Sequence, residues 1–271
     1  MTDIRKTYVD GPDGQIHVRV ADGSASAASE GGARPPLVCF HMSPYSGDYY
    51  RPFQQAVARD RLVLCPDTPG YGGSDAPKTP QGMAGYAAAM IAVLDAFALG
   101  RVDLLGFHTG TFIAVELAVT VPARVRRLVL PGIPYVDAAR RADVKAAYAA
   151  PRPYFDDGSY LAGRWKKGLA ARGRQSDARF LAQFAESLRA GAEGINRGFQ
   201  AVFDYDADDR LPRVTQPVLV PVPDEQLADN SRKAAALIPG ASLAEWPDLS
   251  GDLFEADAAA VAARVRDFLD A

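Results

Sequence analysis

V-D-L-L-G-F-H-T-G-T, residues 102–111, carries the clearest structural pattern in the chain. Its first four residues are largely apolar, which predicts a strand buried on both faces of a parallel sheet. Gly106 and Gly110 flank His108, and this spacing indicates a strand-to-helix turn too tight for side chains at the flanking positions. The side chain of His108 is therefore expected to project above the carboxyl edge of the sheet.

The same alternation of strand and helix recurs on both sides of this stretch. Other short apolar runs that predict buried strands lie at residues 37–40, 62–65, 128–130 and 218–220. Helices are predicted at residues 52–58, 86–99, 111–121 and 256–269. An antiparallel edge pair is predicted near the start, around Tyr8 and over residues 15–20. Together these patterns predict an α/β fold with a doubly wound, mostly parallel sheet and helices on both faces.

The regular alternation stops between Tyr135 and Pro212. This stretch is rich in Ala, Arg and aromatic residues, with a helical piece at residues 176–190, and it lacks a clear apolar strand. We interpret residues 135–212 as a helical cap inserted into a core formed by residues 1–134 and 213–271. Most of its aromatic side chains are expected to pack the cap onto the core, and a few to face an enclosed cavity.

Composition narrows the classes of partner. The 271 residues carry a net charge of −3 and no extended basic cluster, which argues against binding to nucleic acid or to an anionic membrane surface. No apolar run approaches the ~20 residues that a membrane helix needs, and no signal peptide is recognised. Cys39 and Cys65 lie inside apolar runs, as buried reduced thiols would. The sequence thus predicts a cytoplasmic protein with a small-molecule substrate; it leaves the oligomeric state open.

Three stretches resemble motifs of the α/β-hydrolase fold superfamily. L-V-C-F-H-M-S-P (residues 37–44) resembles the third strand and its H-G-x-P loop, and R-L-V-L-C-P-D-T-P-G-Y-G-G-S-D (residues 61–75) resembles the fourth strand and its D-x-P-G-x-G-x-S loop. Residues 102–111 look like the strand, nucleophile elbow and helix. The resemblance implies this fold for nearly the whole chain outside the cap.

The chain departs from the family pattern at the nucleophile. The resemblance places His108 where the family carries its serine. The family's catalytic histidine precedes the last helix, and counting back from that helix reaches Gly251, or Asp252 with a shift of one. The only other histidines are His17 and His41. An ordinary Ser-His-Asp mechanism is therefore not expected.

The family's acid follows the strand predicted at residues 218–220. Counting along the chain puts Gln226 at that position, with Glu225 beside it. The candidates for a carboxylate or amide partner of His108 are therefore Glu225, Gln226 and Asp252, and the sequence does not choose among them.

The resemblance also implies an oxyanion site. Its donors would be the backbone N–H groups of Thr109 and of Ser43, or of its neighbour Met42, which replaces the family's usual glycine. His41 ends the third strand and His108 ends the fifth, so both imidazoles are expected at one pocket. His41 has a structural alternative, in which it bonds backbone groups and holds the oxyanion loop. Three tyrosines are expected to join the pocket: Tyr45, Tyr71 and Tyr135.

Four functions fit a histidine at this turn. In the first, His108 is a general base, because the helix N-terminus disfavours the imidazolium form and keeps the ring neutral. In the second it is a nucleophile that forms an acyl-imidazole. In the third the protein binds a ligand without chemistry. In the fourth, His41, His108 and a carboxylate hold a metal ion.

We favour the first function. The sequence then predicts a cofactor-free enzyme that acts on a small apolar carbonyl compound, by hydrolysis or by a lyase- or isomerase-type proton transfer. No Gly-rich dinucleotide fingerprint follows the first strand, so neither a nicotinamide nor a flavin is expected, and no metal is assigned.

Overall fold

The fold is known from a computed structural model that describes residues 2–24, 34–147, 149, 157–250 and 252–271. Within these residues eight strands form one sheet in the order β1-β2-β4-β3-β5-β6-β7-β8. The strands are β1 (Ile4–Gly11), β2 (Gly14–Asp22), β3 (Leu37–Phe40), β4 (Leu62–Pro66), β5 (Val102–Gly106), β6 (Val125–Val129), β7 (Val218–Asp224) and β8 (Ser242–Ser250). β2 pairs antiparallel with β1 and β4, and every other pair is parallel. The predicted doubly wound, mostly parallel sheet is confirmed.

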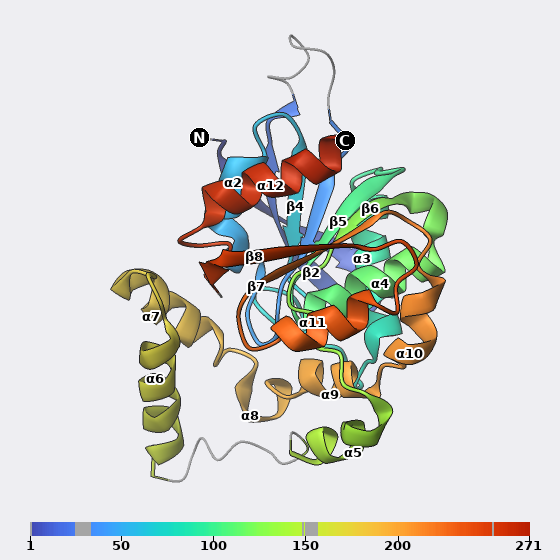
Figure 1. Cartoon of the computed structure of the whole chain (residues 1–271). Coiled ribbons are helices and arrows are strands. Elements are labelled where there is room, and N and C mark those ends of the chain that lie inside the picture. Colours follow the sequence, from blue (N-terminus) through green and yellow to red (C-terminus); the bar gives the residue numbers. More distant parts are fainter. Residues whose placement is uncertain (1, 25–33, 148, 150–156, 251) are drawn as a thin grey trace.

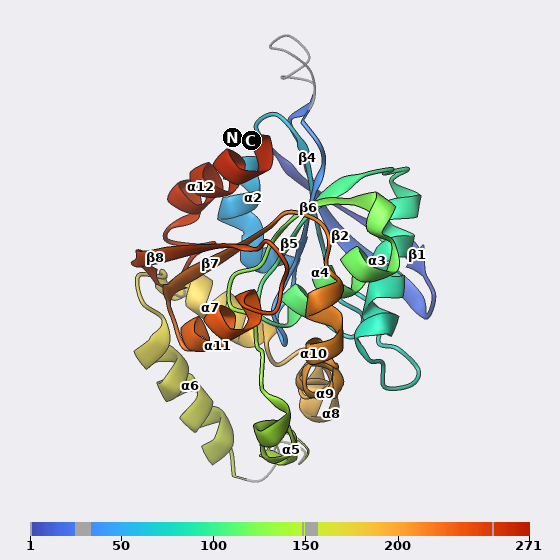
Figure 2. The same cartoon turned by 45° about the vertical axis from the view of Figure 1, so that its right-hand side comes forward.

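Helices cover both faces of the sheet, as Figures 1 and 2 show. α2 (Arg51–Val57) and α12 (Ala258–Asp270) lie side by side on one face, and α3 (Met83–Ala96), α4 (Thr109–Thr120) and α11 (Ala228–Ala235) lie on the other. All four residues of β3 and all five of β5 are buried. β3 reads as a continuous apolar run because neither of its faces meets water. The one charged side chain of β5, Asp103, is buried and paired with Arg126 over 2.6 Å.

The chain between β6 and β7 is helical within its described residues. It contains α5 (Ala138–Ala147), α6 (Ser159–Ala171), α7 (Asp177–Glu186), α8 (Gly191–Gly194), α9 (Arg197–Asp204) and α10 (Ala207–Arg210). We call residues 138–210 the helical segment. In both views it gathers at the end of the sheet opposite the two chain termini.

The two parts of the helical segment are attached to the sheet domain in different ways. α9 and α10 pack on α4, where the Tyr205 hydroxyl donates to the buried Glu116 carboxylate over 2.9 Å. α6 and α7 instead pack on each other through Trp165 and Phe180, whose ring centroids are 4.8 Å apart. α6 has no buried residue. The hairpin of α6 and α7 therefore relies on polar contacts to stay on the sheet domain.

Arg179 of α7 provides the main polar contact of this hairpin. Its guanidinium donates to the carboxylate and the carbonyl of Asp48, which follows β3, and to Glu255, which precedes α12. Nearby, the Arg174 backbone N–H donates to the Asp252 carboxylate over 2.8 Å. One side of α7 is thus tied to two separate loops of the sheet domain.

A first prediction concerns the turn between β5 and α4. A Cβ added at Gly110 would lie 1.9 Å from the carbonyl oxygen of Phe40, so Gly110→Ala forces the helix away from β3. Overpacking of this kind costs about 1–3 kcal/mol of unfolding free energy, which urea denaturation will measure. Gly100→Ala is the matched control, because Gly100 is exposed with no atom within 4 Å of an added Cβ. Equal stability of the two variants would contradict the packing described.

Candidate active site

His108 stands at the sharp turn between β5 and α4. Its backbone has φ 49° and ψ −116°, a region that costs a non-glycine residue about 1–3 kcal/mol. The turn is held from both sides, because a Cβ on Gly106 would lie 2.3 Å from the carbonyl oxygen of Gly110. The His108 carbonyl accepts bonds from the backbone N–H (2.9 Å) and the hydroxyl (2.6 Å) of Thr111. The imidazole is thereby fixed at the carboxyl edge of the sheet.

The ring of His108 is paired with Glu225. The distance from His108 Nε2 to Glu225 Oε2 is 3.1 Å, and the two side chains are 18% and 6% exposed. Glu225 directly follows β7, and β5, β6 and β7 are neighbours in the sheet. Gly132, which follows β6 with φ 65°, lies against the pair. Of the sequence candidates for a partner, the structure brings Glu225 to His108.

The expected oxyanion donors lie beside this pair. Thr109 is the first residue of α4, and no described residue accepts a hydrogen bond from its backbone N–H. The Ser43 N–H points to the same turn and donates to Thr109 Oγ1 over 3.3 Å. Met42 is half-buried, and its carbonyl accepts from the Tyr45 N–H over 3.0 Å. An anion between Ser43 and Thr109 could replace the long bond to the hydroxyl.

His41 is fully buried and both of its ring nitrogens are occupied by backbone groups. Nδ1 lies 2.9 Å from the Met42 carbonyl, and the Thr68 N–H donates to Nε2 over 2.9 Å. A carbonyl accepts and an N–H donates, so Nδ1 carries the proton and Nε2 does not. Burial lowers the pKa of His41 and outweighs the Asp67 charge and the Met42 bond, which raise it. This geometry fits the structural alternative, and it leaves no nitrogen for catalysis or for a metal.

Asp67 organises the loop after β4. Its carboxylate accepts from the N–H groups of Gly47 (2.7 Å) and Gly73 (2.8 Å), and from His17 Nδ1 (2.8 Å). Burial raises the pKa of Asp67, but the bond from His17, the nearby His41 ring and the bond from Gly73 outweigh it, and the pKa lies below its usual value. His17 is thus a buried packing residue that supports this loop.

Two sequence candidates lie apart from the pair. The Asp252 carboxylate accepts from the Arg174 N–H, so it serves the helical segment. Gln226 is exposed and follows Glu225 out of the sheet edge. Gly251, the other position reached by counting, lies outside the described residues.

The three candidate tyrosines lie in different surroundings, and Tyr71 is close to the expected oxyanion loop, since its ring centroid lies 6.3 Å from that of His41. The Tyr71 hydroxyl accepts from Gly198 N–H over 2.6 Å and donates to the Gly194 carbonyl over 3.1 Å, and burial raises its pKa. The Tyr135 hydroxyl donates to Asp208 over 2.6 Å, a bond that raises the pKa of Tyr135 to about 12. Tyr45 is half-buried and lines a cavity of about 150 Å³ together with Arg19 and Glu186. Tyr71 and Tyr135 therefore join the helical segment to the sheet domain.

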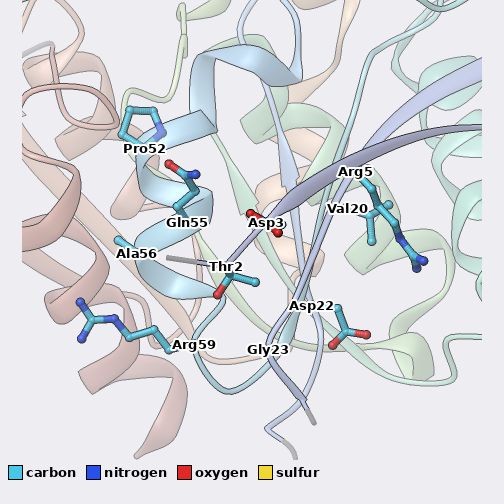
Figure 3. Close-up of a pocket in the computed structure, with 10 residues that line it drawn as sticks. All are labelled: Thr2, Asp3, Arg5, Val20, Asp22, Gly23, Pro52, Gln55, Ala56 and Arg59. Atoms are coloured by element: carbon cyan, nitrogen blue, oxygen red, sulfur yellow. The ribbon is translucent and has the colours of Figure 1, made fainter. Parts of the chain in front are cut away.

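A larger hollow, of about 1040 Å³, lies far from these residues (Figure 3). It is lined by β1, β2 and α2, including Arg5, Asp22 and Arg59. Asp22 pairs with Leu62 at the amino end of β4, whereas His108 follows the carboxyl end of β5. The hollow therefore lies at the amino ends of the parallel strands, opposite the end that carries His108, and none of the candidate residues lines it.

The described residues provide neither a cluster of metal ligands nor a membrane-spanning helix. They contain no group of three or more His, Cys, Asp or Glu side chains that could hold a metal ion. Among their helices none is long and apolar enough to cross a membrane. Cys39 and Cys65 are both buried and free.

Sequence reasoning missed the part played by Gly132. The signal was present, since a glycine follows the apolar run of β6 in L-P-G-I-P. Glycine after a parallel strand indicates a close approach at the edge where ligands bind, but the sequence does not say to which residue.

Comparison with known proteins places the chain in a family. A family profile described as the alpha/beta hydrolase fold matches residues 35–220. The chain belongs to this family. It is 29% identical over 214 residues to a poly(3-hydroxyalkanoate) depolymerase from Ectopseudomonas oleovorans. The matched residues make up 77% of this chain and 75% of that protein. A 2-hydroxy-6-oxo-2,4-heptadienoate hydrolase from Pseudomonas putida is 33% identical over 117 residues, 42% of each chain.

The likeness of this α/β-hydrolase to solved structures extends over almost the whole chain. A hydrolase from Pseudomonas aeruginosa matches with a TM-score of 0.80 and 25% identity, over 98% of this chain and 99% of that one. The family and these neighbours consist mostly of hydrolases.

A second prediction follows from the neutral His41. The folded-state pKa lies below the unfolded value of about 6.5, so below that pH the unfolded chain gains a proton that the folded chain excludes. The free energy of unfolding should therefore fall as the pH drops below about 6.5 toward the lower folded-state pKa of His41. His41→Gln keeps a donor and an acceptor but does not titrate, and it should flatten this slope in thermal unfolding followed by circular dichroism. An unchanged slope in the variant would refute the assignment.

Proposed function

We propose that this protein is a cofactor-free enzyme in which His108 acts as a general base on a small, largely apolar, carbonyl-bearing molecule. The reaction is a hydrolysis in which His108 activates water, or a lyase- or isomerase-type proton transfer. The observation that carries the proposal is the imidazole at the strained turn, next to a Thr109 N–H that no described residue occupies. A base and an anion-stabilising donor at one turn are what such a proton transfer requires.

The chemistry proposed here differs from that of a serine hydrolase. We propose that His108 occupies the position of the family's nucleophilic serine. The loop at residues 252–257, before α12, contains no histidine to relay a proton. Both ring nitrogens of His41 are hydrogen-bonded to backbone groups. An acyl-imidazole is disfavoured, because a ring at the elbow fills space that a substrate carbonyl would need.

The names of the relatives support the class of substrate. One is a depolymerase of poly(3-hydroxyalkanoate), and another is a hydrolase of a 6-oxo dienoate. Both names denote carbonyl-bearing molecules, so we propose the same broad class for this chain. We further propose that the helical segment acts as a cap over the substrate.

A third prediction tests the base. From a panel of esters, lactones and β-diketones, the wild type should convert at least one member. His108→Ala should then lose at least ~100-fold in kcat/KM, the lower end of a general-base contribution. Lys233→Ala, an exposed change on α11, should leave the rate unchanged. Failure of every compound to turn over, together with one that raises the Tm, would instead support a non-catalytic ligand-binding protein.

A fourth prediction concerns serine-directed reagents. A fluorophosphonate probe should not label the protein, because His108 stands at the elbow and no described residue forms a hydrogen bond with its Nδ1, so no hydroxyl is activated by it. Intact-protein mass spectrometry will measure this. His108→Ser should not create an esterase, since the relay remains absent. Stoichiometric labelling of a serine in the wild type would overturn the proposed mechanism.

A further inference from the structure

We propose that Glu225 is a positioning residue that fixes the tautomer of His108, so that Nε2 carries the proton and Nδ1 accepts one from the substrate. This inference rests on the proposed role of His108 as a base, and it adds which ring atom does the work. Because both nitrogens of a free imidazole compete for the proton, a base at this turn needs a partner that chooses between them.

The contact between the side chains makes this choice. Glu225 Oε2 lies 3.1 Å from His108 Nε2. An ionised carboxylate only accepts hydrogen bonds, so the Nε2 must be the protonated nitrogen. A neutral imidazole has a single N–H, and the lone pair then stays on Nδ1. No described residue forms a hydrogen bond with Nδ1, and the side chain of His108 is 18% exposed, so we propose that this nitrogen is the one that meets the substrate.

The environment of Glu225 makes the pairing exclusive. Its side chain is 6% exposed, and its second oxygen, Oε1, is buried without a hydrogen-bond partner among the described residues. Apart from the imidazole, no described donor compensates this carboxylate. A proton arriving at Nδ1 would therefore be stabilised directly by the charge of Glu225.

Gly132 confines the pair sterically. A Cβ at this position would lie 2.4 Å from Cδ2 and 2.8 Å from Nε2 of His108, and 3.1 Å from Glu225 Oε1. Its φ of 65° also favours glycine. The ring and the carboxylate thus meet where three adjacent strands end: β5 supplies His108, β6 is followed by Gly132, and β7 is followed by Glu225.

The proton transfer balances with these groups alone. A C–H or O–H bond of the substrate, or of a water molecule, breaks as the Nδ1–H bond forms. In a lyase- or isomerase-type step the electron pair stays on the substrate as an enolate or alkoxide, whose oxygen accepts from the Thr109 N–H. In a hydrolysis the hydroxide adds to the carbonyl carbon, the carbonyl oxygen takes the negative charge and accepts from the Thr109 N–H, and collapse of this adduct breaks the bond to the leaving group, which takes the proton. Nε2–H stays bonded to Glu225 throughout. Transfer of the same proton from Nδ1 to the product restores the neutral ring.

The three histidines allow a direct test by NMR of ¹⁵N-histidine-labelled protein. Protonated and unprotonated ring nitrogens resonate at well-separated ¹⁵N frequencies, and His108→Asn assigns the signals. His41 and His17 are internal contrasts, because Nδ1 of each faces an acceptor and should carry the proton. For His108 in its neutral form we expect Nε2–H in the wild type. An Nδ1–H form there would overturn the proposal.

Variants connect the tautomer to the rate. Glu225→Ala should give a mixture of the two tautomers at His108 and lower kcat by between ~10² and ~10⁴-fold. Glu225→Gln offers an amide oxygen as acceptor, so it should preserve the tautomer and lose less activity. Gly132→Ala should disturb the His108 signals while those of His41 stay in place. A wild-type tautomer in Glu225→Ala would refute the positioning role.

The two proposals fail in different ways. If the tautomer behaves as expected but no compound is turned over, the proposed enzyme fails and the pairing by Glu225 holds. If turnover depends on His108 while Glu225→Ala keeps both the rate and the tautomer, the base stands and the inference fails.

Discussion

The crowded contact between α4 and the ends of β3 and β5 is the constraint on which the site depends. Gly110 lies against the carbonyl of Phe40, and Gly106 lies against Gly110, with no room for a Cβ at either position. The chain can pass from strand to helix there only through a strained residue, and that residue is His108. The burial of both elements offsets the strain, so the sheet core supports the conformation of one half-buried ring.

The same edge of the sheet shows how neighbours decide the chemistry of a residue type. His41 and His108 end strands β3 and β5, which are adjacent. His41 is enclosed, and two backbone groups fix its proton and use both nitrogens. His108 meets one carboxylate and keeps one nitrogen open. An identical side chain therefore serves as a structural bridge at one strand end and as a candidate base at the next.

Much of the fold could be predicted because buried parallel strands have a simple sequence pattern. β3 was predicted with the bounds that the structure has, residues 37–40. β8 was missed: it is an edge strand in which Trp246 and Leu249 alone are buried, and Pro247 interrupts the pattern. α11, a short polar helix, gave no periodic signal either.

The site was less predictable, because a shift of one residue at the end of a strand changes which side chain faces His108. The predicted strand at residues 218–220 continues to Asp224 in β7, and side chains alternate along a strand. Counting along the chain therefore reached Gln226, whereas Glu225 turns toward His108. Asp252 could not be judged from the sequence, since its partner, Arg174, comes from a helical segment about eighty positions earlier.

The bridge formed by Arg179 has a mechanical consequence. Its guanidinium holds Asp48, which belongs to the loop that also carries Ser43, and it holds Glu255 at the same time. A movement of α7 therefore strains the loop whose backbone N–H faces the elbow, and a shift of that loop pulls on α7. The outer hairpin and the lining of the site are coupled through one side chain, although they lie more than a hundred residues apart in sequence.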